Sequence, residues 1–252
     1  MITLEGRTIL VTGASRGIGA ATARVLLEAG ADVVLHWHTE EAEAGRLAAE
    51  YGPARTCLCR ADLGQREAVR GLWQQALGWR GKLDGLVNNA AVMPYSAPED
   101  PIADWDRDWD RCWTVNVRAV ADLSRAAILH MAARGSGTIV TVSSRAAFRG
   151  DLPDAMHYAA SKGALVALTR SIAKNYAKAG IRAYLVAPGW VRTERVAPRI
   201  DAPENAQMLA ETPMGDAAPP REVGHVIAFL LSGLAEHATG ATVDINGASY
   251  FH

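Results

Sequence analysis

Short apolar runs alternate with longer helical patterns along the whole chain, and this alternation limits the possible folds more than any other feature. The runs are rich in β-branched and other apolar residues, as buried strands are. The predicted strands are Thr8–Val11, Asp32–His36, Ala54–Leu58, Gly85–Val87, Thr138–Val142, Arg182–Val186 and Thr242–Ile245. Strands that alternate with helices form βαβ units, which build a parallel sheet with helices on both faces. The sequence therefore predicts an α/β, doubly wound fold around a seven-stranded parallel sheet.

Helical periodicity fills most of the intervals between these strands. The predicted helices are Ala20–Ala29, Glu40–Glu50, Arg66–Ala76, Trp105–Ala133, Met156–Ala179 and Arg221–Leu231. The segment 192–220 departs from this rhythm because it is rich in proline, alanine and charge without clear periodicity. Only one further helix and strand follow it, so we expect residues 1–252 to form one domain. We interpret 192–220 as a lid over the functional site rather than as a linker.

The charge balance disfavours strongly charged partners. Lys and Arg number 26 against 27 Asp and Glu, so the formal net charge is −1 and no global field would attract nucleic acid or an anionic membrane. No apolar run approaches the roughly 18 residues of a membrane span, and the first residues do not resemble a signal peptide. Cys57, Cys59 and Cys112 have neither a disulfide framework nor a zinc spacing. We expect a cytoplasmic protein that uses no metal and binds a small molecule.

A glycine-rich turn joins the first predicted strand to the first predicted helix. Such a turn brings backbone N–H groups and the positive end of the helix dipole to a pyrophosphate. Gly13 would permit the tight turn, Gly17 would let the backbone approach the phosphates, and Gly19 would let the helix pack on the strand. The predicted cofactor contacts in this turn are Gly13, Ser15, Arg16, Gly17, Ile18 and Gly19. A structural turn without a ligand is the alternative.

The residues after the second strand bear on the choice of nicotinamide cofactor. NAD is usually held there by a carboxylate on its ribose hydroxyls, but the sequence VVLHWHTEE has none directly after the strand. His38 at this position and Arg16 in the glycine turn can instead meet the 2′-phosphate of NADP. We therefore favour NADP(H) over NAD(H), although both residues could be solvated surface residues. Asp62 and Leu63, after the third strand, are candidate adenine contacts, and Asp62 could equally be a helix cap.

Four further features follow in chain order. The sequence NNAA at 88–91 follows the fourth strand, Asn116 lies in the long helix, Ser144 ends the fifth strand, and Tyr158 and Lys162 open the next helix. With the glycine turn upstream, this order resembles the short-chain dehydrogenase/reductase family, in its compact branch. The resemblance covers essentially the whole chain and continues through PGWVRT at 188–193 and TGATVDINGA near the C-terminus. It implies a Rossmann fold and hydride transfer between nicotinamide and a carbonyl or secondary alcohol.

The resemblance implies a catalytic set of Asn116, Ser144, Tyr158 and Lys162. Ketone reduction creates a developing alkoxide that needs a proton, which Tyr158 could supply. A free tyrosine has a pKa of about 10, and Lys162, one helical turn later, is expected to lower it. Lys162 could also hold the nicotinamide ribose, and Ser144 could orient the substrate oxygen. By resemblance, Asn116 holds its helix open around a water that relays protons to Lys162. Each residue alone could be purely structural.

The resemblance also implies cofactor contacts beyond the glycine turn. They are Asn89, Ala90, Tyr158, Lys162, Pro188, Gly189, Val191 and Thr193. The Pro188–Gly189 step would let the chain cross over the nicotinamide, and Thr193 would bond its carboxamide. One departure concerns the distance from Ser144 to Tyr158, which is one residue longer than is common in the family. Either the loop between them carries an insertion or the serine is displaced to Ser143, and we choose Ser144.

The substrate stays open at this point. The segments ETPMG at 211–215 and AFLLSG at 228–233 resemble 3-oxoacyl-acyl-carrier-protein reductases, which grip an acidic carrier with basic residues. Here Arg134 and Lys178 are isolated, so a polyol, sugar or xenobiotic carbonyl is an equal alternative. A nucleotide-sensing regulator without turnover, or a lyase or isomerase on the same scaffold, is a further alternative. Regulators usually lose the tyrosine or the lysine, and both are present.

Several other side chains need an interpretation. Trp105, Trp109 and Trp113 repeat every four residues, which favours a packing or subunit-contact surface over a platform for substrate. We expect a homotetramer, because such helices pair across two-fold axes in this family. His157 is expected to be solvated. Substrate specificity is expected in the lid, with Trp190, Arg195 and Met208, and in the loops 93–96 and 149–157.

Overall fold

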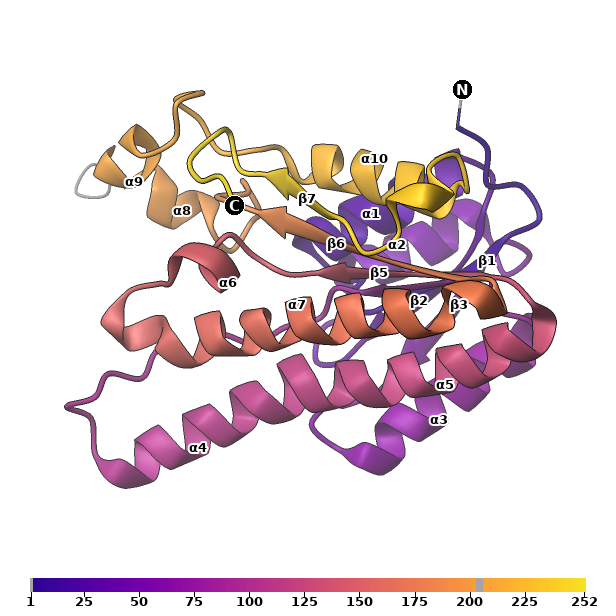
Figure 1. Cartoon of the computed structure of the whole chain (residues 1–252), viewed down its shortest axis with the longest axis horizontal. Helices are drawn as coiled ribbons and strands as arrows, with labels where there is room; N and C mark the ends of the chain where they lie inside the picture. Colours follow the sequence, from indigo (N-terminus) through magenta and orange to yellow (C-terminus); the bar gives the residue numbers. More distant parts are fainter. Residues whose placement is uncertain (1, 203–205) are drawn as a thin grey trace.

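The computed structural model describes residues 2–202 and 206–252. Its sheet has seven parallel strands in the order β3-β2-β1-β4-β5-β6-β7 (Figure 1). The strands are β1 (Thr8–Val11), β2 (Asp32–Trp37), β3 (Thr56–Arg60), β4 (Gly85–Asn88), β5 (Gly137–Val142), β6 (Ile181–Pro188) and β7 (Thr242–Ile245). This order confirms the predicted doubly wound fold. The chain reverses its winding between β1 and β4, and α/β sheets bind ligands beside the carboxyl ends of their strands at such a point.

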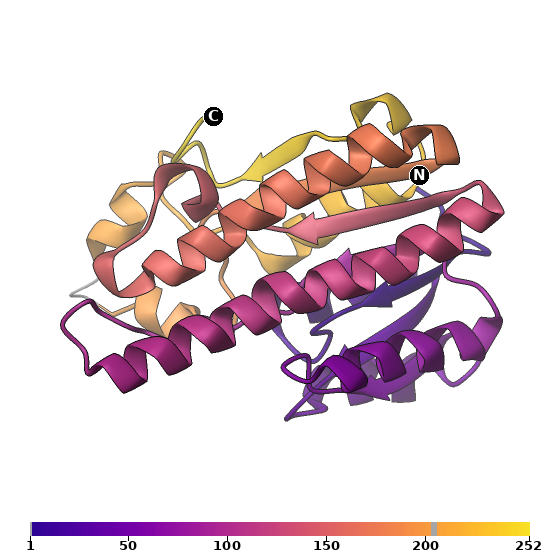
Figure 2. The ribbon, with the colours of Figure 1, turned by 60° about the horizontal axis from the view of Figure 1, so that its bottom comes forward.

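The helices form two layers, one on each face of the sheet. One layer holds α1 (Gly17–Glu28), α2 (Ala42–Tyr51) and α10 (Pro220–Leu231), and the other holds α3 (Arg66–Arg80), α5 (Ala119–Arg134) and α7 (Met156–Tyr176). In Figure 2, α5 and α7 run alongside each other across the second face. A separate apolar cluster fills each layer, as expected for strands that are buried on both faces.

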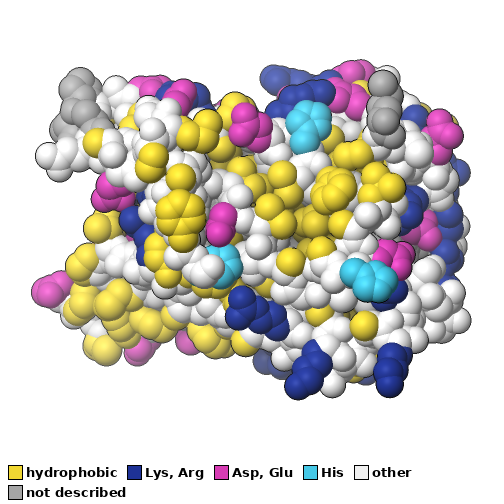
Figure 3. Space-filling view, turned by 45° about the horizontal axis from the view of Figure 1, so that its top comes forward, with side chains coloured by type: hydrophobic (Ala, Val, Ile, Leu, Met, Phe, Trp, Pro, Cys, Tyr) yellow, Lys and Arg dark blue, Asp and Glu magenta, His cyan; other side chains and the backbone are white. Residues whose placement is uncertain are grey.

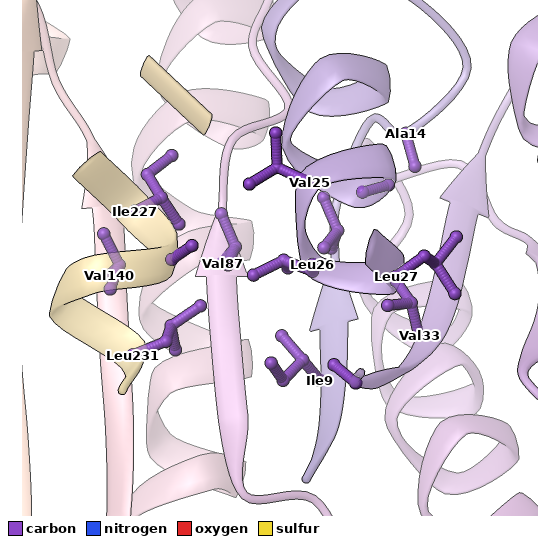
Figure 4. Packing of buried hydrophobic residues seen from close by; sticks show 14 of the residues in the cluster. Ile9, Ala14, Val25, Leu26, Leu27, Val33, Val87, Val140, Ile227 and Leu231 are labelled. Atoms are coloured by element: carbon purple, nitrogen blue, oxygen red, sulfur yellow. The ribbon is translucent and has the colours of Figure 1, made fainter. Parts of the chain in front are cut away.

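The contact between α1 and α10 is especially close. A Cβ atom at Gly224 would lie 3.1 Å from Cα of Thr22, so the glycine lets the two helix backbones approach. Leu26, Ile227 and Leu231 are buried under this contact against the sheet (Figure 4). Each such side chain contributes roughly 1.5–3 kcal/mol of burial free energy. The contact anchors α1, whose first turn carries the glycine-rich sequence.

The third strand begins two residues later than the sequence predicts. Gly52 ends α2 with φ of +73°, and both the N–H and the hydroxyl of Thr56 donate to its carbonyl. Ala54 and Arg55 therefore lie in a turn, where Arg55 forms an ion pair with Asp32. The predicted start was wrong because apolar content alone does not reveal this turn.

The predicted continuous helix Trp105–Ala133 is also wrong in detail. The structure has α4 (Ile102–Trp113), a π-helical turn at Thr114–Arg118, and then α5. The side chain of Asn116, inside the π-helical turn, bonds to the backbone of Val92 on both its oxygen and its nitrogen. A π-helical turn widens the helix locally and is common at functional sites. Met156–Ala179 similarly ends as a 3₁₀ turn, Ala177–Ala179, after α7.

The described parts of the segment 192–220, residues 192–202 and 206–220, lie at the carboxyl edge of the sheet and include two short helices that the sequence does not predict. They are α8 (Ala197–Ile200) and α9 (Ala206–Ala210), and α6 (Ala146–Arg149) lies at the same edge (Figure 1). The base of the segment is closed by a parallel bridge between Val191 and Ala218. Arg192 adds ion pairs to Asp201 and Asp216, each at 2.6 Å.

Candidate active site

The glycine turn has the strained geometry that its sequence implies. Gly13 and Gly17 have φ of +69° and +54°, in the left-handed region that favours glycine. A Cβ atom on Gly19 would lie 2.0 Å from the carbonyl oxygen of Gly13, so no larger residue fits there. The N–H of Gly17 donates to a carboxylate oxygen of Glu194 at 3.1 Å. An anionic group from another segment thus already lies on the backbone amide that a phosphate would use.

A buried histidine supports this turn, and the sequence analysis missed it. His36 lies at the end of β2, where its Nδ1 accepts the N–H of Gly13 at 3.0 Å and its Nε2 lies 3.1 Å from the carbonyl of Ala61. Burial lowers the pKa of His36 to about 4. The ring is therefore neutral near pH 7, with Nδ1 as the acceptor and Nε2 as the donor. A histidine inside an apolar strand gives no sequence signal for this role.

Asn89 and Thr12 hold the other side of the turn. The Thr12 hydroxyl accepts the N–H groups of Asn89 and Ala90 at 2.9 and 3.1 Å. The Asn89 amide in turn donates to the carbonyls of Thr12 and Gly13 at 2.8 and 3.3 Å. The NNAA sequence therefore braces the glycine turn with a side chain.

One cavity of about 690 Å³ connects the glycine turn to the carboxyl ends of β4, β5 and β6. Its lining includes every cofactor contact that the sequence predicts and three of the four predicted catalytic residues. These residues are Gly13, Ser15, Arg16, Gly17, Ile18, Gly19, His38, Asp62, Leu63, Asn89, Ala90, Ser144, Tyr158, Lys162, Pro188, Gly189, Val191 and Thr193. The predicted residues thus come from seven separate segments of the chain and line one cavity.

Basic and acidic side chains meet where the cavity passes the ends of β2 and β3. Arg16 is exposed just before α1, and His38 follows β2. The His38 ring lies 3.9 Å from Asp62, whose carboxylate also accepts the N–H of Gly64 at 2.9 Å. Asp62 therefore closes a turn and is not the cap of α3, whose N-cap residue is Gln65, and it lines the cavity as well. Glu40 lines the same cavity two residues beyond His38.

Tyr158 and Lys162 lie one turn apart on α7. The Lys162 side chain is buried, its Nζ donates to the carbonyl of Val142 at 2.8 Å, and it lies 5.6 Å from the centre of the Tyr158 ring. Desolvation raises the pKa of Tyr158 to about 12, and the hydrogen-bonding Ser144 side chain opposes this rise. Burial lowers the pKa of Lys162 to about 8. The expected lowering of the Tyr158 pKa is not found in this arrangement, because desolvation is the largest influence on it and raises it.

The choice between the two serines before α6 is clear from their partners. Ser143 is buried and its hydroxyl donates to the carbonyl of Lys162 at 3.1 Å. Ser144 accepts the N–H of Ala146 and lies beside Tyr158 in the cavity. The longer loop before Tyr158 folds into α6 and a 3₁₀ turn, Pro153–Ala155, so it does not displace Ser144.

Asn116 is the predicted catalytic residue that does not line the cavity. Its buried amide contacts the Val92 backbone, the Cys112 thiol and the Ser161 hydroxyl. These contacts occur where the π-helical turn opens the helix, as the resemblance implies. The amide thus contacts α7 through Ser161, which lies between Tyr158 and Lys162 in the sequence.

Two further expectations about side chains near the site need correction or restriction. His157 is buried rather than solvated, because Trp109 packs on its ring and its Nε2 lies 2.7 Å from the carbonyl of Pro94. Trp190 and Arg195, which were expected to face the substrate, line the cavity. The Met208 side chain falls outside the described residues.

The cavity contains charged residues that the sequence analysis did not select. They include Arg145 and Arg149, which follow β5, and Glu194 and Glu211 from the segment after β6. Their positions depend on how two distant loops fold over the sheet, which local sequence patterns do not encode.

Figure 3 shows the face above α8, α9 and α10, where hydrophobic side chains gather in the middle and charged side chains lie mostly around the edge.

In residues 2–202 and 206–252, no helix is long and apolar enough to cross a membrane. No group of three or more His, Cys, Asp or Glu in the same described part of the chain could hold a metal ion.

Known proteins resemble this chain over nearly its full length. A family model described as enoyl-(acyl carrier protein) reductase matches residues 13–248. A cis-4-hydroxycyclohexanecarboxylate dehydrogenase of Sinomonas cyclohexanicum is 39% identical over 96% of this chain and 95% of its own. A 3-oxoacyl-(acyl-carrier-protein) reductase of Rickettsia conorii is 32% identical, with 98% of each chain covered.

Solved structures show the same architecture. A gluconate 5-dehydrogenase of Burkholderia cenocepacia, in complex with NADP and tartrate, has a TM-score of 0.88 at 31% identity and covers 98% of this chain and 96% of its own. A putative NAD(P)-dependent gluconate 5-dehydrogenase of Beutenbergia cavernae, with bound NADP, has a TM-score of 0.89 at 33% identity, with 98% of each chain covered. The glycine turn, the tyrosine and lysine of α7 and these matches lead to one conclusion: the chain belongs to the short-chain dehydrogenase/reductase family and is an oxidoreductase of alcohol and carbonyl groups.

Proposed function

We propose that this enzyme uses NADP(H) to interconvert a ketone and a secondary alcohol, with Tyr158 as the acid/base. The observation that carries the proposal is the single cavity that joins the glycine turn to Ser144, Tyr158 and Lys162. The Gly17 N–H, which donates to the Glu194 carboxylate, would donate equally well to a pyrophosphate oxygen. When bound, the nicotinamide would supply or accept the hydride.

Side chains of the protein would orient the substrate and transfer the proton. Ser144 would hold the substrate oxygen by a hydrogen bond and orient it toward Tyr158. With a pKa raised to about 12, Tyr158 is protonated at neutral pH and can donate its proton to the developing alkoxide. Lys162 would turn its ammonium from the Val142 carbonyl toward the bound ribose and assist reprotonation of Tyr158. Asn116 would keep the helix behind these groups open.

The NADP preference rests on Arg16, His38 and the missing carboxylate directly after β2. Two similar solved structures contain NADP, which supports this choice. We predict that NADPH binds more tightly than NADH and that Arg16→Ala reduces this preference by about tenfold, the usual scale for one charge-assisted contact. Fluorescence titration of both cofactors measures it. Tighter binding of NADH, or an unchanged preference in the variant, would contradict the assignment.

We propose that the substrate is a small polar molecule rather than a carrier-bound thioester. Arg134, one of two candidate carrier contacts, forms an ion pair with Asp84 at 2.9 Å, so it is not part of an open basic cluster. A 3-oxoacyl thioester is the second candidate, supported by the similarity to the Rickettsia conorii reductase. A panel of alcohols, ketones and acyl thioesters, assayed with both cofactors by absorbance, separates the two. No turnover with any member would favour a regulator, lyase or isomerase.

A further inference from the structure

A buried arginine directly follows Ser144 and has an incomplete set of partners. The Arg145 side chain is 5% exposed and its guanidinium carbon lies 5.5 Å from the centre of the Trp190 ring. Its Nη1 has no hydrogen-bond partner among the described residues. Burial and the neighbouring charge of Arg149 lower the pKa of Arg145. A buried cation with unused donors is costly unless an anion completes it.

A second arginine extends the same cationic group. Arg149 lies one helical turn after Arg145 and lines the same cavity. One carboxylate serves both, since an oxygen of Glu211 lies 3.0 Å from Arg149 and 3.8 Å from Arg145. Asp151 also lines the cavity, but its carboxylate accepts the N–H of Leu152. The two guanidinium groups therefore share a single bound carboxylate.

The segment 192–220 places carboxylates on anion-binding groups at two separate points. Glu194 accepts the N–H of Gly17, the amide assigned above to a pyrophosphate. Glu211 makes the equivalent kind of contact with the two arginines, although its side chain is 55% exposed. In the first case the carboxylate stands where an anionic ligand would bind. Glu211 likewise places a carboxylate on cationic groups, Arg145 and Arg149. Arg145 directly follows Ser144, the serine that would hold the reacting oxygen.

We propose that Arg145 and Arg149 form a subsite for a carboxylate of the substrate, which Glu211 occupies until the substrate displaces it. This rests on the proposed function, because it places the carboxylate close to the group held by Ser144. The substrate class is then a small hydroxy acid or keto acid. A planar guanidinium fork matches a carboxylate in geometry as well as in charge. Displacement of Glu211 would also release the lid segment from the loop after β5.

The test measures binding without turnover. Cyclohexanecarboxylate and cyclohexanecarboxamide have the same ring and differ in charge, and neither carries a hydroxyl to oxidise. Calorimetry on the full-length protein saturated with NADP⁺ should show the carboxylate binding at least about tenfold more tightly, as expected for charge-assisted hydrogen bonds. Equal affinity for the two probes would overturn the subsite.

Single substitutions show which residues bind the carboxylate probe. Arg149→Gln should weaken carboxylate binding by about tenfold and leave carboxamide binding unchanged. Glu211→Gln should strengthen carboxylate binding several-fold, because it removes the internal competitor. Arg192→Gln is the matched control, since it removes ion pairs of the same segment outside the cavity and should leave both affinities within about twofold. Arg145→Gln is informative only if its melting temperature matches the wild type, because the side chain is buried.

The outcomes separate this inference from the proposed function. An unchanged carboxylate affinity in Arg149→Gln, or a weaker one in Glu211→Gln, would refute the subsite even in an enzyme that oxidises neutral alcohols. Discrimination of the two probes without any turnover in the alcohol panel would instead support the subsite and refute the proposed function.

Discussion

At the scale of single residues, the site depends on side chains that support the glycine turn as much as on the residues that line the cavity. His36 fixes the Gly13 amide through an unprotonated Nδ1, and Asn89 fixes the carbonyls of the same turn. These contacts set the shape of the glycine turn, which we propose as the phosphate site. Protonation of His36 would remove the acceptor for Gly13.

This gives a prediction for stability against pH. The pKa of His36 is lowered to about 4 in the folded protein, from 6.5 in the unfolded chain. Between these values the unfolded state binds more protons, so the stabilisation is complete above about pH 6.5 and is lost as the pH falls toward 4. We expect a loss of about 2–3 kcal/mol from this group over that window.

Urea unfolding at several pH values measures this loss. His36→Asn places an amide oxygen near the position of Nδ1 and does not titrate, so its stability should vary less over the same window. His237→Asn, at an exposed histidine, is the control and should retain the wild-type dependence. Identical pH profiles for His36→Asn and the wild type would show that His36 is not the titrating group.

The sequence predicted those site residues whose type and order along the chain indicate a chemical role by themselves. The glycine turn, Ser144, Tyr158 and Lys162 all meet in one cavity, as expected. It did not reveal His36, Arg145, Glu194 or Glu211, because their roles come from contacts across distant loops. The pKa of Tyr158 was missed for a related reason, since desolvation depends on the packing around the ring and not on the spacing to Lys162.

At the scale of elements, boundaries were predicted less well than the elements themselves. β3 was shifted because Thr56 forms a turn with Gly52, and the long helix was interrupted because Asn116 opens a π-helical turn. Both departures come from side-chain contacts with the backbone, which hydrophobic periodicity does not report. The periodic segments themselves, such as α1, α7 and α10, were all found.

The segment 192–220 is the element whose motion we predict. It lines the cavity through Thr193, Glu194, Arg195 and Glu211, and its base is pinned by the bridge between Val191 and Ala218. We propose that it is a lid that closes over nicotinamide and substrate and excludes water. Hydrogen exchange across 192–220 should slow when NADPH and a substrate analogue bind, while exchange in α5 stays constant. High protection in the free enzyme, unchanged by ligands, would mean that the segment is not a lid.

At the scale of the whole molecule, the alternation of strands and helices was sufficient to predict the fold. A continuous sheet from β3 to β7 leads us to propose that the chain forms one domain. Association between chains is harder to predict, because a surface helix and an interface helix differ little in sequence. Cys57, Cys59 and Cys112 are not paired in disulfides.

We predict a homotetramer from the apolar side chains that the described chain leaves exposed on one layer. Ile102 and Trp113 on α4, Leu129 on α5 and Tyr176 on α7 are 72%, 46%, 58% and 39% exposed. Trp105 and Trp109 stack on each other nearby, with ring centres 5.1 Å apart, and they do not line the cavity as it is described. Light scattering at micromolar concentration should give four times the chain mass. A monomeric mass would contradict this prediction.

The most direct test of the enzymatic account is the turnover of Tyr158→Phe. This change removes the proton donor and leaves the ring in place. We predict that kcat falls by about 10²-fold or more with any substrate of the panel, while NADPH affinity, measured by fluorescence, stays within about twofold of the wild type. A variant that turns over at the wild-type rate would contradict the assignment of Tyr158 as the acid/base.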